Sequence, residues 1–130
     1  MKIRILVVDD EPDICQILSE ILRAEGYDVV VAHNSDEFCL QALTKIPNLI
    51  ILDINLGNSL GPEVYSEILC KGLDPTTPVI FLSALVPEEF VSKDIVPSGR
   101  KYTLHAKPFH HDRLIQDVRR LTENLNTEAA

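Results

Sequence analysis

The sequence predicts a doubly wound α/β fold, in which a five-stranded parallel sheet carries helices on both faces. Short and mostly apolar runs, rich in β-branched residues, have the character of strands buried on both sides: residues 3–8, 29–31, 49–52, 79–82 and 102–106. Segments with the spacing of amphipathic helices alternate with these runs. Strands that alternate with helices form parallel sheets, and right-handed crossovers distribute the helices over the two faces.

The first two helices have clear start and stop signals. One is expected to begin at Pro12 and to end at Gly26. Its apolar stripe follows the helical repeat: Ile14, Ile17, Leu18, Ile21 and Leu22. The second follows a capping box made by Asn34 and Glu37 and ends at Pro47.

Three further helices complete the alternation. One follows a loop at 57–61 and ends near Gly72, and a short one is expected from Pro87 to a point before Pro97. The last has its own apolar stripe: Leu114, Ile115, Val118, Leu121 and Leu125. The 130 residues suffice for one domain, which we expect to cover 1–125, with a frayed tail at 126–130.

Composition excludes several classes of protein. Twelve basic against 20 acidic residues give a net charge of −8, which disfavours direct binding to nucleic acid or to anionic membranes. The apolar run at 5–8 is too short for a signal peptide, and no run approaches the roughly 18 residues of a membrane span. Cys15, Cys39 and Cys70 are far apart and form no metal-binding pattern. We expect reduced thiols in a cytoplasmic protein.

The residues that could carry chemistry follow the predicted strands. Asp9 and Asp10 follow the first strand, Asp53 the third, Ser83 the fourth, and Lys107 follows the fifth. The carboxyl ends of parallel strands meet at one edge of a sheet, where ligands bind in doubly wound folds. We therefore expect three carboxylates, a hydroxyl and an ammonium in one cleft.

This set of groups indicates phosphoryl transfer onto a carboxylate. Crowded carboxylates repel one another unless a cation binds, and Mg²⁺ prefers oxygen ligands together with a phosphate. An aspartate can act as the nucleophile and form an aspartyl-phosphate, for which Asp53 is the best candidate. Lys107 and the metal would neutralise the phosphoryl oxygens, and Ser83 could hydrogen-bond one of them.

Four motifs carry a resemblance to a known family: VVDDEP at 7–12, LDINL at 52–56, LSA at 82–84 and AKPF at 106–109. Together with Gly61, eight residues after Asp53, they resemble the receiver domain of bacterial two-component response regulators, over about residues 1–125. The resemblance implies the flavodoxin-like strand order 2-1-3-4-5. It also implies a phosphoaccepting signalling domain rather than an enzyme.

The resemblance assigns a role to each matching residue. It implies that Asp53 is the phosphoacceptor, and that Asp10, Asp9 through a water molecule, Asp53 itself and the backbone carbonyl of Asn55 hold Mg²⁺. Ser83 would be the switch hydroxyl and Lys107 the cation that senses the phosphate, and Pro108 would follow a cis peptide bond. The implied partners are a histidine kinase or phosphotransfer protein as donor, and a downstream protein contacted directly. Because no effector domain follows residue 125, we expect a stand-alone receiver, unless the chain is a fragment.

Three features depart from the family pattern. Gly57 stands where the family has proline, which should loosen the loop. Leu104 stands where the family usually has an aromatic residue, and Ser83 and Lys107 are 24 positions apart, a wider gap than usual. We therefore expect the signal to run mainly through reordering of 85–101, with Leu104 serving only in packing.

The sequence is also compatible with two other classes of protein. A Mg²⁺-dependent phosphohydrolase of the haloacid dehalogenase type would use Asp53 in turnover, but needs a second aspartate where this chain has Asn55. A pseudo-receiver would bind partners without phosphate, an alternative that rests only on the unusual segment before Lys107. A flavin protein is disfavoured, because no phosphate-binding loop follows the first strand.

Overall fold

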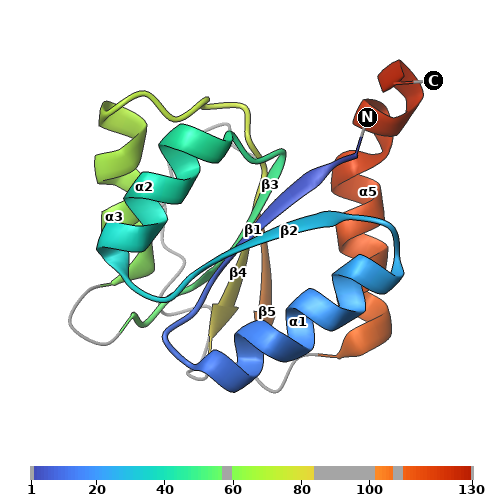
Figure 1. Ribbon diagram of the computed structural model, residues 1–130, viewed down its shortest axis with the longest axis horizontal. Helices are drawn as coiled ribbons and strands as arrows, with labels where there is room; N and C mark the ends of the chain where they lie inside the picture. Colours follow the sequence, from blue (N-terminus) through green and yellow to red (C-terminus); the bar gives the residue numbers. More distant parts are fainter. Residues whose placement is uncertain (1, 57–59, 84–101, 107–109, 130) are drawn as a thin grey trace.

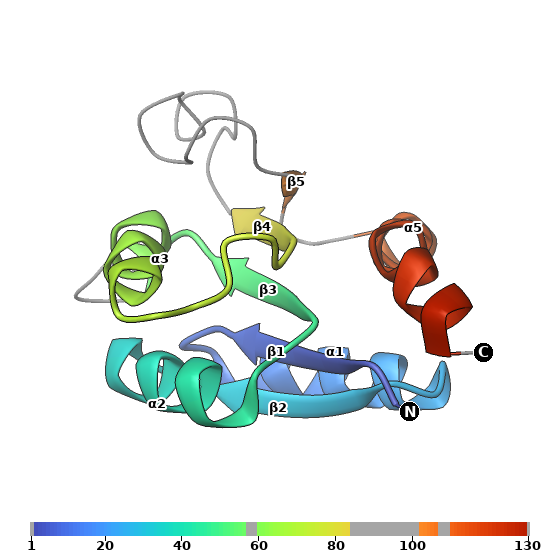
Figure 2. The same cartoon turned by 90° about the horizontal axis from the view of Figure 1, so that it is seen from above.

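The molecule is a three-layer sandwich with one parallel sheet at its centre. The computed structural model describes residues 2–56, 60–83, 102–106 and 110–129. Helices α1 (Pro12–Ala24) and α5 (His111–Ala129) cover one face of the sheet, and α2 (Ser35–Lys45) and α3 (Gly61–Cys70) cover the other (Figures 1 and 2). The predicted doubly wound architecture is therefore confirmed. The short helix expected from Pro87 lies outside the described residues.

Every strand pair in the sheet is parallel. The strands are β1 (Arg4–Val8), β2 (Asp28–Ala32), β3 (Leu49–Asp53), β4 (Val79–Ser83) and β5 (Tyr102–Ala106). Their spatial order is β2-β1-β3-β4-β5, as the family resemblance implied. Since β1 and β3 are direct neighbours, with Val8 beside Leu52, the residues that follow these two positions emerge side by side.

The sequence signals act at the helix ends much as predicted. The Asn34 side chain accepts a hydrogen bond from the Glu37 backbone N–H at 2.8 Å, which is the expected cap of α2. In return the Glu37 carboxylate accepts a hydrogen bond from the His33 N–H, and this bond lowers the pKa of Glu37. Gly26 and Gly72 adopt the positive φ values that a helix stop favours, 92° and 119°.

One helix stops where Pro47 predicts, and another runs farther than predicted. Helix α2 ends at Lys45, and its C-cap residue Ile46, directly before Pro47, takes a left-handed conformation (φ 50°) that is unusual for a β-branched residue. Helix α5 continues to Ala129, past the expected end at Leu125. The residues after Leu125 contain neither glycine nor proline, so nothing in them stops a helix.

A separate apolar cluster fills the space on each face of the sheet. On the α1 and α5 face, Ile5, Val7 and Ile51 pack against Leu18 and Val118. On the other face the fully buried aromatic rings gather, and Tyr65 meets Phe81 edge to face with ring centres 6.5 Å apart. All five residues of β3 are buried. The strand that ends in Asp53 is therefore held on both sides.

Polar contacts add to the packing of α5. His105 of β5 and Asp117 of α5 approach to 2.6 Å between Nε2 and Oδ2, with the two side chains 10% and 24% exposed. Farther along the helix, the Tyr27 hydroxyl lies 3.5 Å from the Thr122 hydroxyl, and Thr122 is fully buried. Helix α5 thus contacts both the edge strand β5 and the residue that precedes β2.

Candidate functional site

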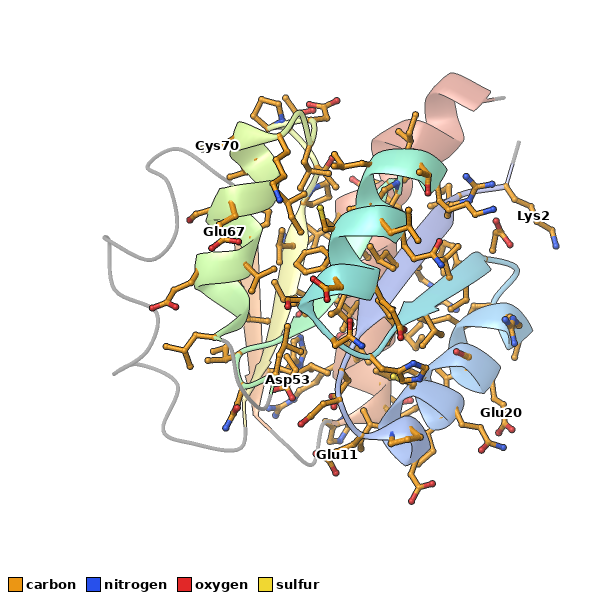
Figure 3. All side chains as sticks on the ribbon, turned by 60° about the vertical axis from the view of Figure 1, so that its left-hand side comes forward. Lys2, Glu11, Glu20, Asp53, Glu67 and Cys70 are labelled. Carbon is orange, nitrogen blue, oxygen red and sulfur yellow. The ribbon has the colours of Figure 1, made fainter. Side chains whose placement is uncertain are left out.

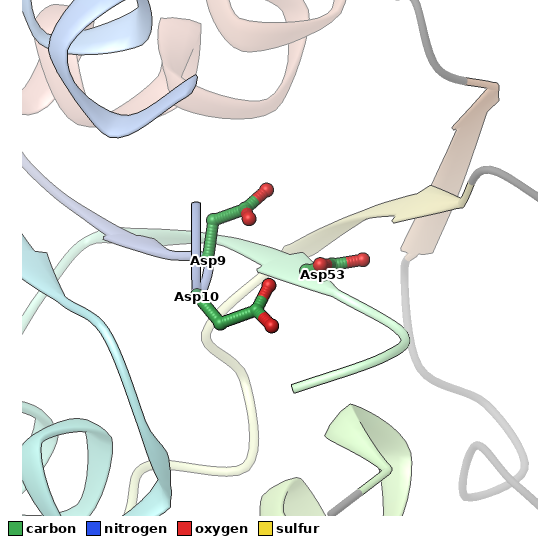
Figure 4. A group of neighbouring side chains, drawn as sticks. All are labelled: Asp9, Asp10 and Asp53. Atoms are coloured by element: carbon green, nitrogen blue, oxygen red, sulfur yellow. The ribbon is translucent and has the colours of Figure 1, made fainter. Parts of the chain in front are cut away.

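Three carboxylates meet at the carboxyl edge of the sheet. Asp9 and Asp10 directly follow β1, and Asp53 is the last residue of β3. One oxygen atom of each carboxylate lies within 4.8 Å of the others. Figure 4 shows the three side chains grouped at the ends of these two strands, and Figure 3 places Asp53 and Glu11 at the same end of the molecule. The structure therefore brings together the acidic residues that the sequence singled out.

Backbone groups orient the two buried members of this cluster. Asp9 is fully buried and Asp53 is 4% exposed, whereas Asp10 is exposed. The Asp9 Oδ1 atom accepts a hydrogen bond from the Glu11 N–H at 3.0 Å, and the Asp53 Oδ1 atom accepts one from the Asn55 N–H at 3.2 Å. Each buried carboxylate is thus fixed by an amide two residues farther along the chain.

Gly61 allows α3 to begin directly against the end of β3. An added Cβ at this position would lie 2.2 Å from the Asp53 carbonyl oxygen, which is far inside van der Waals contact. The Gly61 N–H donates to the Ile54 carbonyl at 2.7 Å, and Asn55 forms an antiparallel bridge with Leu60. In the sequence, Gly61 was recognised only as part of a motif, and its close approach to Asp53 was not predicted. The signal that could have shown its role is a glycine placed at the first position of a helix.

The other predicted site residues are described only in part. Ser83 is the last residue of β4 and pairs with Ala106 of β5, which places its backbone at the same edge of the sheet. The backbone of Leu104 pairs with Phe81. The Ser83 side chain and the segment 107–109, with Lys107 and Pro108, lie outside the described residues. Their roles stay predictions, and the same holds for Gly57 and the segment 85–101.

The chain matches the model of one protein family, the response regulator receiver domain, over residues 5–119. The nitrogen assimilation regulatory protein NtrX of Azorhizobium caulinodans is 35% identical over 121 residues, which are 93% of this chain and 26% of that protein. The DNA-binding response regulator MtrA of Mycolicibacterium smegmatis is 34% identical over 131 residues, covering 95% of this chain and 53% of that protein. The chain thus spans about a quarter to a half of the length of these curated relatives.

Solved structures share the same fold. The receiver domain of NtrX from Brucella abortus superposes with a TM-score of 0.78 at 33% identity, covering 92% of this chain and 98% of that one. The chemotaxis protein CheY4 of Vibrio cholerae gives 0.81 at 26% identity, covering 93% and 99%. The chain therefore belongs to the receiver domain family of two-component response regulators, a family of signalling domains rather than of conventional enzymes. No helix among the described residues has both the length and the apolar character needed to cross a membrane.

Gly61→Ala is expected to lower the free energy of unfolding by about 1–3 kcal/mol, because the new methyl group must displace either α3 or the Asp53 carbonyl. Urea denaturation followed by circular dichroism measures this loss. Ser66→Ala, an exposed change on the same helix, should be nearly neutral. Equal stability of the two variants would show that the close approach at Gly61 is unimportant.

Asp10→Asn is expected to raise the free energy of unfolding in EDTA, by about 1 kcal/mol, because it removes one of three crowded like charges. Thermal or urea melts without divalent ions test this. Asp13→Asn makes the same charge change in the first turn of α1, outside the cluster, and serves as the control. A clear loss of stability in Asp10→Asn would mean that its carboxylate is a satisfied structural group.

Proposed function

We propose that the chain is a Mg²⁺-dependent phospho-aspartate switch, in which Asp53 accepts a phosphoryl group from a histidine kinase or a phosphotransfer protein. The observation that carries this proposal is the convergence of Asp9, Asp10 and Asp53 within 4.8 Å, with Asp53 at the end of a fully buried strand. Membership in the receiver family supports it.

The acidic cluster fits a divalent cation. Two of its three carboxylates are buried, and buried charges of one sign are costly without a compensating positive charge. The carboxylates of Asp9, Asp10 and Asp53, with the backbone carbonyl of Asn55, would supply the hard oxygen ligands that Mg²⁺ prefers. When bound, Mg²⁺ would neutralise negative charge that develops on the oxygens of the transferred group.

Phosphorylation requires a carboxylate oxygen of Asp53 to form a bond to phosphorus. The phosphorus–nitrogen bond of the donor phosphohistidine breaks, its electron pair returns to the imidazole, and that ring takes a proton from solvent. The Asn55 N–H holds one Asp53 oxygen in place, so the carboxylate meets the donor in a fixed orientation. In our proposal the Lys107 ammonium pairs with one phosphoryl oxygen, and the Ser83 hydroxyl donates to another.

The wider assignments follow from this proposal. The phosphorylated domain would shift its population toward a form that a downstream protein recognises. We propose output by protein contact without direct binding to nucleic acid or membrane, in keeping with the net charge of −8. A cytoplasmic location fits a histidine kinase partner, and the three cysteines are free thiols. We also propose 1–125 as the functional unit.

Intact mass spectrometry with acetyl phosphate tests the proposal. The native chain should gain the mass of one phosphoryl group only when Mg²⁺ is present, and hydroxylamine should remove it, as expected for an acyl phosphate. Asp53→Asn should gain nothing, because the amide is no nucleophile. Asp36→Asn, an exposed change at the start of α2, should behave like the native chain.

Three outcomes would count against the assignment. Modification of Asp53→Asn would move the acceptor elsewhere. Release of many phosphates per protein would favour the phosphohydrolase, although Asn55 occupies the place of the general acid that such an enzyme needs. A native chain that is never modified would favour a pseudo-receiver.

A further inference from the structure

The buried thiol of Cys15 contacts the backbone of Asp9, one of the three residues of the acidic cluster. Cys15 lies in the first turns of α1 and is only 3% exposed. Its Sγ atom donates a hydrogen bond to the backbone carbonyl of Asp9 at 3.3 Å. The proposed phosphoryl transfer does not use this thiol.

The Asp9 carbonyl belongs to the peptide between two residues of the acidic cluster. It belongs to the rigid planar peptide that joins Asp9 to Asp10. Fixing this plane limits both the ψ angle of Asp9 and the φ angle of Asp10. The position of the carbonyl oxygen therefore limits the directions in which the two side chains can leave the end of β1.

Further contacts hold the same turn. The Asp9 N–H donates to the Ala32 carbonyl in β2 at 3.1 Å, and the Asp9 carboxylate accepts from the Glu11 N–H. The backbone N–H of Cys15 donates to the Glu11 carbonyl at 3.2 Å. Cys15 thus contacts the turn twice, once through its backbone and once through its thiol. Both contacts tie α1 to the residues that lead out of β1.

We propose that Cys15 is a positioning residue for the cation site, because its thiol holds the Asp9–Asp10 peptide in the orientation that turns both carboxylates toward Asp53. This inference rests on the proposed Mg²⁺ site. The thiol is a weak donor, but the loss of a hydrogen bond to a buried carbonyl is unfavourable. Once the donor is removed, the peptide either stays in place at a cost in stability or turns and carries the carboxylates with it.

The other two cysteines do not share this environment. Cys39 lines the groove between α2 and α3, where its sulfur lies 4.0 Å from the Lys71 ammonium. Cys70 is exposed, and Figure 3 shows it at the opposite end of the molecule from Asp53. Cys39→Ala is therefore a matched control for the loss of a thiol away from the acidic cluster.

The test is the Mg²⁺ affinity of the unphosphorylated protein, measured from amide chemical shifts in NMR spectra. This readout needs no tryptophan, which the chain lacks. Cys15→Ser keeps a donor and should bind Mg²⁺ within about twofold of the native chain. Cys15→Ala and Cys15→Val remove the donor and should weaken binding by about three- to tenfold, the range expected for one lost hydrogen bond. Cys39→Ala should bind as the native chain does.

Unchanged affinity in Cys15→Ala and Cys15→Val would overturn the inference, even if both variants were less stable, since the contact would then be purely structural. Should the alanine variant fail to fold, Cys15→Thr and Cys15→Val decide the question, because they share one shape and differ in the donor. Equal affinities in that pair would also contradict the proposal. If the native chain binds no Mg²⁺, both the proposed function and this inference are refuted. If the native chain binds Mg²⁺ and the Cys15 variants bind it equally well, only this inference is refuted.

Discussion

Three negative charges must be held within 4.8 Å of one another, and much of the structure around the carboxyl edge of the sheet serves this constraint. Asp9 directly follows β1 and Asp53 ends the adjacent strand β3, so the two backbones cannot separate without breaking the hydrogen bond from Asp9 to Ala32 or the pairing of Asp53 with Leu82. Burial of an ionised carboxylate is costly, and Asp9 and Asp53 are both buried. The fully buried side chains of β1 and β3 offset that cost, since each contributes roughly 1.5–3 kcal/mol on leaving water.

The same constraint explains several contacts that the described residues make near the cluster. An amide hydrogen bond fixes one oxygen of Asp9 and another fixes one of Asp53. The absence of a side chain at Gly61 lets α3 close against the Asp53 carbonyl. The Cys15 thiol donates a hydrogen bond to the Asp9 carbonyl. Each contact limits the freedom of an acidic residue that repulsion would otherwise push outward, which is the preorganisation that cation binding requires.

The sequence predicted the layers, the strands and the acidic edge because these follow from local patterns. Runs of β-branched residues, helical stripes and Asp9, Asp10 and Asp53 at strand ends are all visible in one dimension. The hydrogen bond from Cys15 to Asp9 and the contact of His105 with Asp117 depend on which elements pack together, so no local pattern reports them. The left-handed conformation of Ile46 is also not reported by a local pattern, because its own preference argues against it, and a side chain that is 71% exposed gains little from packing there. Ser83 and Lys107 were predicted from their positions at strand ends and from the family motifs, and their side chains lie outside the described residues.

The dependence of stability on Mg²⁺ tests this account most directly. If the carboxylates are held together for a cation, the free energy of unfolding should rise with Mg²⁺ concentration by about 1.4 kcal/mol per tenfold increase above the dissociation constant. Urea denaturation at a series of Mg²⁺ concentrations measures this slope, with sodium chloride at matched ionic strength as the reference. A stability that responds to Mg²⁺ no more than to sodium chloride would contradict the claim that the acidic edge is built around a cation.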